Sequence, residues 1–418
     1  MLAAEFSQRL SDEAAQLNER GAIEPNSDRI DRAADTAARM RTEFGRFGIT
    51  RLAEVTGLDL IGIPVWMAVR PNARTLSVSQ GKGLTDAAAQ ASAIMEAVEL
   101  AVAERLDMDF RLCAAADLAR AGEHALPLLN LLSRGETKIG ETTLLAWAEG
   151  IDLLRCCPVW VPADTLSLDG SKGVTGQKSQ YWRSSDGLAS GNLLLEAIVH
   201  GLCERIERDA STLWLLRCDR DIFERCVSPA DLQDKAVLRL AAQIADAELE
   251  LRLFDITSDV DVPVFFATIS PRLDGREQHW KYFDLSSGSG CHPTAARAAI
   301  RAITEAAQSR VTSIAGARDD FDPGLYRQRL GADLLAYPAA SPGRARVWPK
   351  EPMPPARLLE HMLQRLRSAG IRSVVAVPLM LGDGFAVAKV LVPDLEHLDG
   401  DRRQRFGSRA LRAMVGAL

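Results

Sequence analysis

Glutamates recur on three alanine-rich segments of this chain, and each segment follows a stretch rich in glycine and serine. The pairs are residues 77–83 with Glu96 and Glu99, residues 184–192 with Glu196, Glu204 and Glu207, and residues 286–290 with Glu305. Clustered carboxylates repel one another in an apolar setting, so they persist together around cations or basic groups. A magnesium nucleotide supplies such cations, and turns at helix starts offer N–H groups to its phosphates. The pattern therefore predicts a magnesium-nucleotide site.

Helical spacing places these carboxylates on shared faces. Glu96 and Glu99 are three residues apart, as are Glu204 and Glu207, and such neighbours share one side of a helix. Arg301 lies four residues before Glu305 on the third segment. If all three helices turn these faces inward, the carboxylates meet in one pocket. For any single helix, the ordinary alternative is a solvated face with a surface ion pair.

Other reactive residues carry weaker signals. Lys82 sits in a Gly-Lys-Gly stretch that lacks the spacing of a phosphate-binding loop, so a solvated loop lysine is expected. We expect His200 to be packed or exposed rather than a general base. Cys203 and Cys291 are interpreted as small hydrophobic filling. The seven cysteines form no Cys-x-x-Cys pair, which argues against a structural zinc site or a disulfide framework.

Composition excludes several classes of protein. The 418 residues carry a net charge of −6 without a long basic block, which argues against nucleic acid as a partner. The N-terminus lacks the apolar core of a signal peptide, and no apolar run approaches the ~20 residues of a membrane span. We therefore expect a cytoplasmic protein of two or three lobes without a membrane segment.

The periodicity of the chain predicts an α+β fold in which antiparallel strands pack against long helices. Residues 318–357 are rich in Pro, Arg and Asp and are expected to form a surface excursion. Expected helices cover 28–47, 85–106, 193–216, 228–246, 293–312 and 356–368. Expected strands cover 61–69, 74–79, 158–162, 249–255, 262–269, 372–380 and 385–392.

Six ordered motifs carry a family resemblance. They are Thr56-Gly-Leu-Asp-Leu-Ile-Gly-Ile-Pro-Val-Trp66, Ser79-Gln-Gly-Lys-Gly83, Ser92-Ala-Ile-Met-Glu96-Ala-Val-Glu99, Gly187-Leu-Ala-Ser-Gly-Asn192, Glu204-Arg-Ile-Glu-Arg-Asp209 and Arg301-Ala-Ile-Thr-Glu305. Together they resemble the YcaO superfamily, and within it most closely the members that work beside a TfuA protein. The resemblance implies a catalytic domain at residues 28–395, an N-terminal extension at 1–27 and a C-terminal tail at 396–418.

The resemblance implies an enzyme that uses ATP and Mg²⁺ to phosphorylate a backbone amide oxygen of a peptide or protein. Its fold would consist of repeated units of antiparallel strands and long helices around a central nucleotide site. The metal-binding residues would be Glu96, Glu99, Glu204 and Glu207. The nucleotide-binding residues would be Arg29, Thr36, Glu96, Asn192, Glu196, Arg208, Arg301 and Glu305. Catalysis would rest on Glu204, Glu207 and Arg301. A homodimer is also implied.

The product depends on the nucleophile. Sulfide yields a thioamide, a Cys, Ser or Thr side chain yields an azoline, and an amine yields an amidine. The chain shows neither the proline-rich tail of many azoline-forming members nor a fused leader-binding segment. We therefore expect thioamidation of a ribosomally made peptide or protein with a TfuA-like partner. The alternatives are an azoline-forming cyclodehydratase with a separate leader-binding partner, and a non-catalytic nucleotide-binding scaffold.

Overall fold

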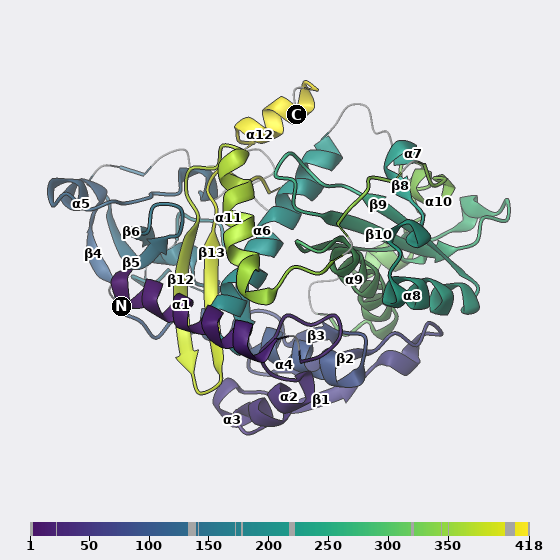
Figure 1. The fold of residues 1–418 in the computed structure, drawn as a ribbon, viewed down its shortest axis with the longest axis horizontal. Helices are drawn as coiled ribbons and strands as arrows, with labels where there is room; N and C mark the ends of the chain where they lie inside the picture. The colour runs from purple at the N-terminus through teal and green to yellow at the C-terminus, as the bar shows by residue number, and fades with distance from the viewer. Residues whose placement is uncertain are drawn as a thin grey trace.

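The fold is known from a computed structural model of the chain. It describes residues 3–416 except 22, 133–138, 141, 172, 177–178, 217–221, 319–321, 344, 350 and 398–405. Three antiparallel sheets and the helices that pack on them make up this part of the chain, which confirms the predicted α+β class (Figure 1).

Each sheet is associated with one long helix. The first has the strand order β1 (Arg51–Glu54), β2 (Val65–Val69), β3 (Val78–Lys82) and packs on α4 (Asp86–Glu104). The second has the order β4 (Arg111–Ala114), β5 (Leu144–Asp152), β12 (Val375–Gly382), β13 (Phe385–Leu391), β7 (Leu188–Gly191), with β6 (Cys157–Pro162) also paired to β5; it packs on α6 (Leu194–Leu216). The third has the order β11 (Ser286–Cys291), β10 (Val264–Pro271), β9 (Leu249–Asp255), β8 (Cys226–Val227) and packs on α9 (Ala295–Ala315).

Shorter elements complete the structure. The other helices are α1 (Ala3–Arg20), α2 (Ala33–Arg41), α3 (Phe44–Phe47), α5 (Ala115–Arg120), α7 (Ile222–Arg225), α8 (Lys235–Asp246), α10 (Ala336–Ala339), α11 (Leu358–Ser368) and α12 (Ser408–Met414). The 3₁₀ helices are η1 (Thr56–Leu58), η2 (Leu129–Leu131), η3 (Ala163–Thr165), η4 (Pro229–Leu232), η5 (Glu277–His279), η6 (Tyr282–Asp284), η7 (Pro323–Tyr326) and η8 (Pro355–Arg357).

The glycine- and serine-rich stretches are strands, where the sequence had predicted turns. They form β3, β7 and β11, and each is the terminal strand of its sheet. Glycine is needed there because the following helix lies against the strand backbone. A Cβ on Gly81 would lie 2.0 Å from the backbone nitrogen of Ala93, and one on Gly290 would lie 2.2 Å from the carbonyl oxygen of Ala298. The small side chains of the alanine-rich helices and the glycines of the strands together allow helix and strand backbones to pack closely.

Several predicted boundaries were wrong. The helix expected at 28–47 is divided into α2 and α3, and the helix expected at 228–246 begins at Lys235 after the 3₁₀ turn η4. The hairpin partner expected at 74–79 is β3, at Val78–Lys82. Strand β5 was missed within a stretch interpreted as loop-rich. The shift of β3 has a physical cause, because a short polar, glycine-bearing strand owes its form to tertiary packing rather than to β propensity.

The N-terminal helix α1 packs against the start of α6. Phe6 and Leu17 of α1 are buried in the same hydrophobic cluster as the apolar face of α6. The buried carboxylate of Glu13 accepts a hydrogen bond from the backbone N–H of Leu195, with 2.7 Å between the heavy atoms. This contact satisfies one of the unpaired N–H groups at the start of the helix and favours its dipole. Helix α1 therefore supports the helix that carries more of the predicted site residues than any other element.

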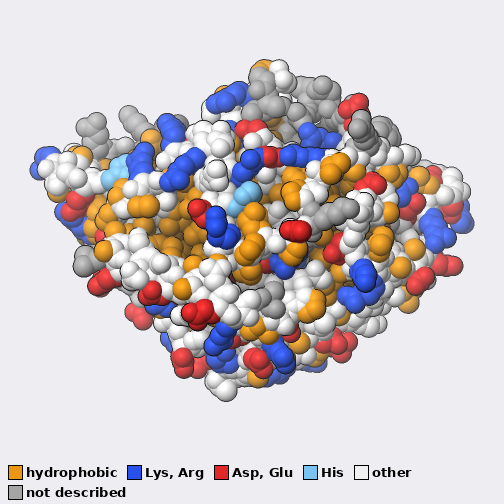
Figure 2. All heavy atoms as spheres, viewed as in Figure 1, with side chains coloured by type: hydrophobic (Ala, Val, Ile, Leu, Met, Phe, Trp, Pro, Cys, Tyr) orange, Lys and Arg blue, Asp and Glu red, His pale blue; other side chains and the backbone are white. Residues whose placement is uncertain are grey.

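One face of the molecule is visible in Figure 2. Basic and acidic side chains are interspersed on it, and hydrophobic side chains gather at the left, over the six-stranded sheet. In the described part of the chain, no helix is long and apolar enough to cross a membrane.

Candidate functional site

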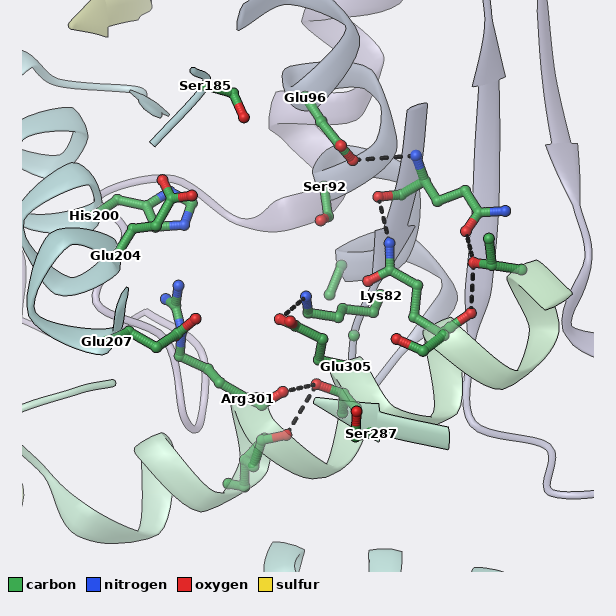
Figure 3. A pocket seen from close by; sticks show the side chains of 18 of the residues that line it. Lys82, Ser92, Glu96, Ser185, His200, Glu204, Glu207, Ser287, Arg301 and Glu305 are labelled. Carbon is green, nitrogen blue, oxygen red and sulfur yellow. Dashed lines mark hydrogen bonds and ion pairs between the residues drawn. The ribbon is translucent and has the colours of Figure 1, made fainter. Parts of the chain in front are cut away.

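A cavity of about 1900 Å³ lies between the three glycine–serine strands and their helices. Figure 3 shows Glu96, Glu204, Glu207, Arg301 and Glu305 around its open centre, contributed by α4, α6 and α9. The other predicted residues that line it are Arg29, Thr36, Glu99, Asn192 and Arg208. Glu196 lines a smaller cavity of about 180 Å³, which shares Arg29, His200 and Arg301 with the large one. The structure thus brings together all of the residues that the sequence proposed.

The carboxylates of α4 each accept a hydrogen bond from a glycine–serine strand. Glu96 accepts from the backbone N–H of Gln80 on β3 (3.1 Å), and Glu99 from the hydroxyl of Ser190 on β7 (2.6 Å). Burial raises the pKa of Glu96 to about 6, against the opposing effect of Lys82. Burial, reinforced by Glu96 and Glu204, raises the pKa of Glu99 to about 8. A nearby cation would stabilise the ionised form of both carboxylates, because it replaces the hydration that burial removes.

The carboxylates of α6 surround an arginine of the same helix. The guanidinium of Arg208 lies 3.6 Å from Glu204, 3.7 Å from Glu207 and 3.5 Å from Asp186. Burial disfavours its charge, but the surrounding carboxylates outweigh burial and raise the pKa of Arg208. Burial and repulsion from Glu305 raise the pKa of Glu207 to about 7, and burial also raises the pKa of Glu204. One arginine is therefore insufficient to neutralise both glutamates.

The carboxylate of α9 has its own cation. Lys82, at the end of β3, lies 2.7 Å from Glu305, and the interaction is drawn in Figure 3. Burial opposes ionisation of Glu305, but Lys82, Arg208 and Arg301 together hold the pKa of this carboxyl below its ordinary value. The interpretation of Lys82 as a solvated loop lysine was therefore wrong. The sequence signal for Lys82 was its position at the end of a glycine–serine stretch, separated by only Gly83, Leu84 and Thr85 from the start of α4.

A second cluster of polar residues lies at the N-terminal end of α6. Glu196 accepts from the backbone N–H of Ile30 (2.6 Å) and pairs with the Arg29 guanidinium (3.2 Å). The Thr36 hydroxyl donates to the side-chain oxygen of Asn192 (2.9 Å). Residues far apart in sequence are thus joined into one polar cluster, which sits beside Ser190 and hence beside Glu99.

His200 and the cysteines adjoin this cluster. His200 lines both cavities and lies beside Glu204 in Figure 3. Burial, helped by Arg301 and Arg29, lowers its pKa well below the ordinary value, so the ring is neutral. Cys203 and Cys291 are buried free thiols, and the Cys203 sulfur lies 3.6 Å from that of Met362. Cys218 lies outside the described residues.

The donor set fits magnesium held jointly with phosphates. Carboxylate oxygens are the side-chain ligands that Mg²⁺ prefers, and it usually keeps water and phosphate oxygens as its other ligands. Among the described residues, no three His, Cys, Asp or Glu side chains meet closely enough to hold a metal ion by themselves. The α4 and α6 carboxylates therefore offer partial coordination, and their raised pKa values show that they lack compensating charge.

Comparison with known proteins agrees with this geometry. Residues 80–396 match the model of the YcaO cyclodehydratase family, described as ATP- and Mg²⁺-binding. An uncharacterized protein in the tfuA 3′ region of Rhizobium leguminosarum bv. trifolii is 38% identical over 408 residues, 94% of each chain. An uncharacterized protein of Methanothermobacter thermautotrophicus is 32% identical over 394 residues, 90% of this chain and 97% of that protein.

Solved structures share the fold. YcaO from Methanopyrus kandleri, bound with AMPPCP and Mg²⁺, superposes with a TM-score of 0.64 at 21% identity, covering 88% of this chain and 93% of that one. A heterocyclase in complex with substrate and cofactor gives a TM-score of 0.74 at 19% identity, covering 93% of this chain. This chain spans about half (55%) of the heterocyclase.

These findings define first an enzyme class and then a family. The protein is an ATP-dependent, peptide-modifying enzyme, and its cofactors are ATP and Mg²⁺. The chain belongs to the YcaO family, whose chemistry is ATP- and Mg²⁺-dependent activation of a backbone amide.

Proposed function

We infer that this enzyme converts a backbone amide of a ribosomally made peptide or protein into a thioamide, with a TfuA-like protein as its partner. The observation that carries this proposal is the relative in the tfuA 3′ region, which aligns with 94% of this chain and is itself covered to 94%. Alignment over nearly the whole of both chains supports a shared reaction more strongly than a shared domain would.

The polar clusters suggest where each part of the nucleotide lies. Arg29, Thr36, Asn192 and Glu196 form the cluster at the start of α6 and would contact the nucleoside end. Glu96, Glu99, Glu204 and Glu207 would hold Mg²⁺ through carboxylate oxygens. Arg208 and Arg301, with Glu305 and its partner Lys82, would then face the terminal phosphates.

The reaction balances with hydrosulfide as the nucleophile. Its sulfur adds to the amide carbon, and the carbonyl oxygen accepts the terminal phosphoryl group of ATP. The carbon–oxygen bond then breaks, phosphate leaves with that oxygen, and a proton is lost as the C=S bond forms. Bound Mg²⁺ would offset negative charge on the transferring phosphoryl group. Arg301 would stabilise the same charge from α9, and the fixed positive groups need no reorganisation during transfer.

Mass spectrometry tests the product. The enzyme, with Mg-ATP, sulfide and a TfuA-like protein, is incubated with candidate short peptides encoded near its own gene. We expect a mass gain equal to exchange of oxygen for sulfur, dependent on both ATP and sulfide. Loss of one water, independent of sulfide, would instead establish azoline formation and contradict the proposal. A reaction without the TfuA-like protein separates its role from that of the enzyme.

A further inference from the structure

The large cavity extends well beyond the residues that would hold a nucleotide. Its volume of about 1900 Å³ exceeds the roughly 300–1,000 Å³ of ordinary small-molecule sites. One end is lined by Trp214 of α6, Phe266 of β10 and Tyr337 of α10, which we call the aromatic end. The cavity therefore has room for a second ligand beside the nucleotide.

Helix α6 sets the order of the parts along the cavity. A helix rises about 1.5 Å per residue, so Glu196 lies roughly 16 Å along the axis from Glu207, and Trp214 roughly 10 Å beyond Glu207. The cluster at Glu196 and the aromatic end therefore lie on opposite sides of the carboxylates. A nucleotide that extends from Glu196 to Glu207 points its terminal phosphate toward the aromatic end, where the reacting amide must arrive.

The rings of the aromatic end form one packed surface. The ring centre of Trp214 lies 5.3 Å from that of Phe266 and 5.6 Å from that of Tyr337, and those two are 5.7 Å apart. Leu334, one turn before Tyr337, lines the cavity beside them. Such a surface favours an apolar side chain over a charged one, because a charge placed there loses its hydration without gaining a partner.

Strands β10 and β11, which line the cavity at the aromatic end, can also contact a peptide backbone. Phe266 is paired with Ser289, and Thr268 with Ser287, so these side chains share the sheet face turned away from α9. Ser287 is exposed in an otherwise buried strand, and Figure 3 places it beside Arg301 and Glu305. Because β11 is the terminal strand of its sheet, an extended peptide can align along it.

We propose that the aromatic end binds the substrate peptide next to its reacting amide, and that it selects an aromatic or branched apolar side chain at the flanking position. This inference rests on the proposed function, because it assumes that a peptide amide meets the terminal phosphate. The side chain would pack against Trp214, Phe266 and Tyr337, while the peptide backbone follows β11 and delivers its carbonyl oxygen to the region of Arg301.

The test measures binding of two capped pentapeptides by calorimetry, in the presence of Mg²⁺ and a non-hydrolysable ATP analogue. The peptides are Gly-rich and differ at the central residue, which is phenylalanine in one and aspartate in the other. We expect the phenylalanine peptide to bind roughly tenfold more tightly, as burial of an aromatic side chain implies. In Leu334→Arg the preference should reverse toward the aspartate peptide. Val347→Arg is the control: this side chain is 92% exposed and lies, like Leu334, within residues 318–357, and its substitution should leave the preference for the phenylalanine peptide unchanged.

The outcomes separate the two proposals. Equal affinities, or no binding of the phenylalanine peptide while the Mg-nucleotide still binds, would overturn the aromatic end as a substrate site. A preference that survives Leu334→Arg would place the side chain elsewhere and would overturn it as well. Failure of the wild-type protein to bind the Mg-nucleotide would instead count against the proposed function.

Discussion

The carboxylates on the two sides of the cavity have pKa values shifted in opposite directions. On the α4 and α6 side, burial raises the pKa of Glu96 to about 6, of Glu207 to about 7 and of Glu99 to about 8. On the α9 side, Lys82, Arg208 and Arg301 overcome burial and lower the pKa of Glu305. Both sides use the same strand and helix construction, and the same cations act on both: Lys82 on Glu96, and Arg208 and Arg301 on Glu207. The difference therefore lies in whether burial or the nearby cations dominate at each carboxylate.

The two sides therefore require different groups from a ligand. The α4 and α6 carboxylates need positive charge from outside, which Mg²⁺ would supply. The surroundings of Glu305 already carry positive charge from Lys82 of β3, Arg208 of α6 and Arg301 of α9, which suits an anionic phosphoryl group. The nucleotide complex would join the two, with its metal facing one side and its phosphates the other.

Substitution of an α6 carboxylate should have the largest effect. In Glu204→Gln and Glu207→Gln, loss of a charged metal ligand should lower ATP-dependent turnover roughly 100-fold or more, as loss of transition-state charge stabilisation does elsewhere. The metal-free Glu207→Gln protein should keep or gain thermal stability, because burial and repulsion from Glu305 and Glu204 disfavour this charge more than Arg208 and Arg301 favour it. Turnover and melting temperature are measured together.

The matched control is Glu360→Gln, an exposed glutamate on α11 that should change neither quantity. Full activity in Glu204→Gln or Glu207→Gln would contradict the metal assignment. A large fall in melting temperature would point to a structural role instead.

Lys82 tests the opposite side of the cavity. If it faces the terminal phosphate, Lys82→Met should weaken Mg-ATP binding roughly tenfold, the scale of a charge-assisted hydrogen bond, and should leave ADP affinity nearly unchanged. Lys82→Arg should recover part of the loss. Calorimetric titration with each nucleotide distinguishes these results, and Lys235→Met, another lysine of the cavity wall, is the control. Equal losses for ATP and ADP would remove Lys82 from the terminal phosphate.

The raised pKa values predict a pH dependence. Glu96, Glu99 and Glu207 hold protons in the folded, metal-free protein above the ordinary carboxyl pKa of 4.5, where the unfolded chain has released them. These three carboxylates should therefore lower the stability of the metal-free protein as pH rises from about 5 to about 8, while the lowered pKa values of His200 and His292 contribute the opposite slope below about pH 6.5. Saturating Mg-ATP should reduce this fall, because Mg²⁺ favours the ionised forms.

Thermal unfolding with and without Mg-ATP across this range checks the sign. Calorimetry in buffers of different ionisation enthalpy should also detect release of protons on binding at neutral pH. A stability difference between the Mg-ATP-bound and metal-free protein that does not widen as pH rises would show that these carboxylates ionise freely in the fold.

The smallest effect on function is expected from the glycine strands, where the two sides are built alike. Gly81→Ala on the α4 side and Gly290→Ala on the α9 side should each cost about 1–3 kcal/mol of folding stability through overpacking, because the added Cβ would meet helix backbone. Gly57→Ala, with open space around its Cβ, is the control. Denaturant titration gives the free energies, and a cost confined to one side would show that the packing is not equivalent.

Long periodic segments could be predicted from sequence, and short polar ones could not. The helix expected at 193–216 is α6 at Leu194–Leu216, because apolar residues on a 3.6-residue period and alanine-rich composition act locally. The stretches at 77–83, 184–192 and 286–290 have a composition typical of turns, and only the neighbouring sheets make them strands. Family motifs named the candidate residues that the cavity brings together, but neither they nor the spacing predicted the pairing of Lys82 with Glu305.

Local periodicity and the ordered motifs are enough to predict the helix faces that carry the glutamates, the family, and the ATP and Mg²⁺ chemistry. The tertiary structure decided which charges compensate one another. Lys82 and Glu305 are joined by packing of β3 and α9, and Glu196 is joined to Arg29 by packing of the N-terminal segment on α6. Burial, which sets the pKa of each carboxylate, exists only once the sheets and helices have assembled.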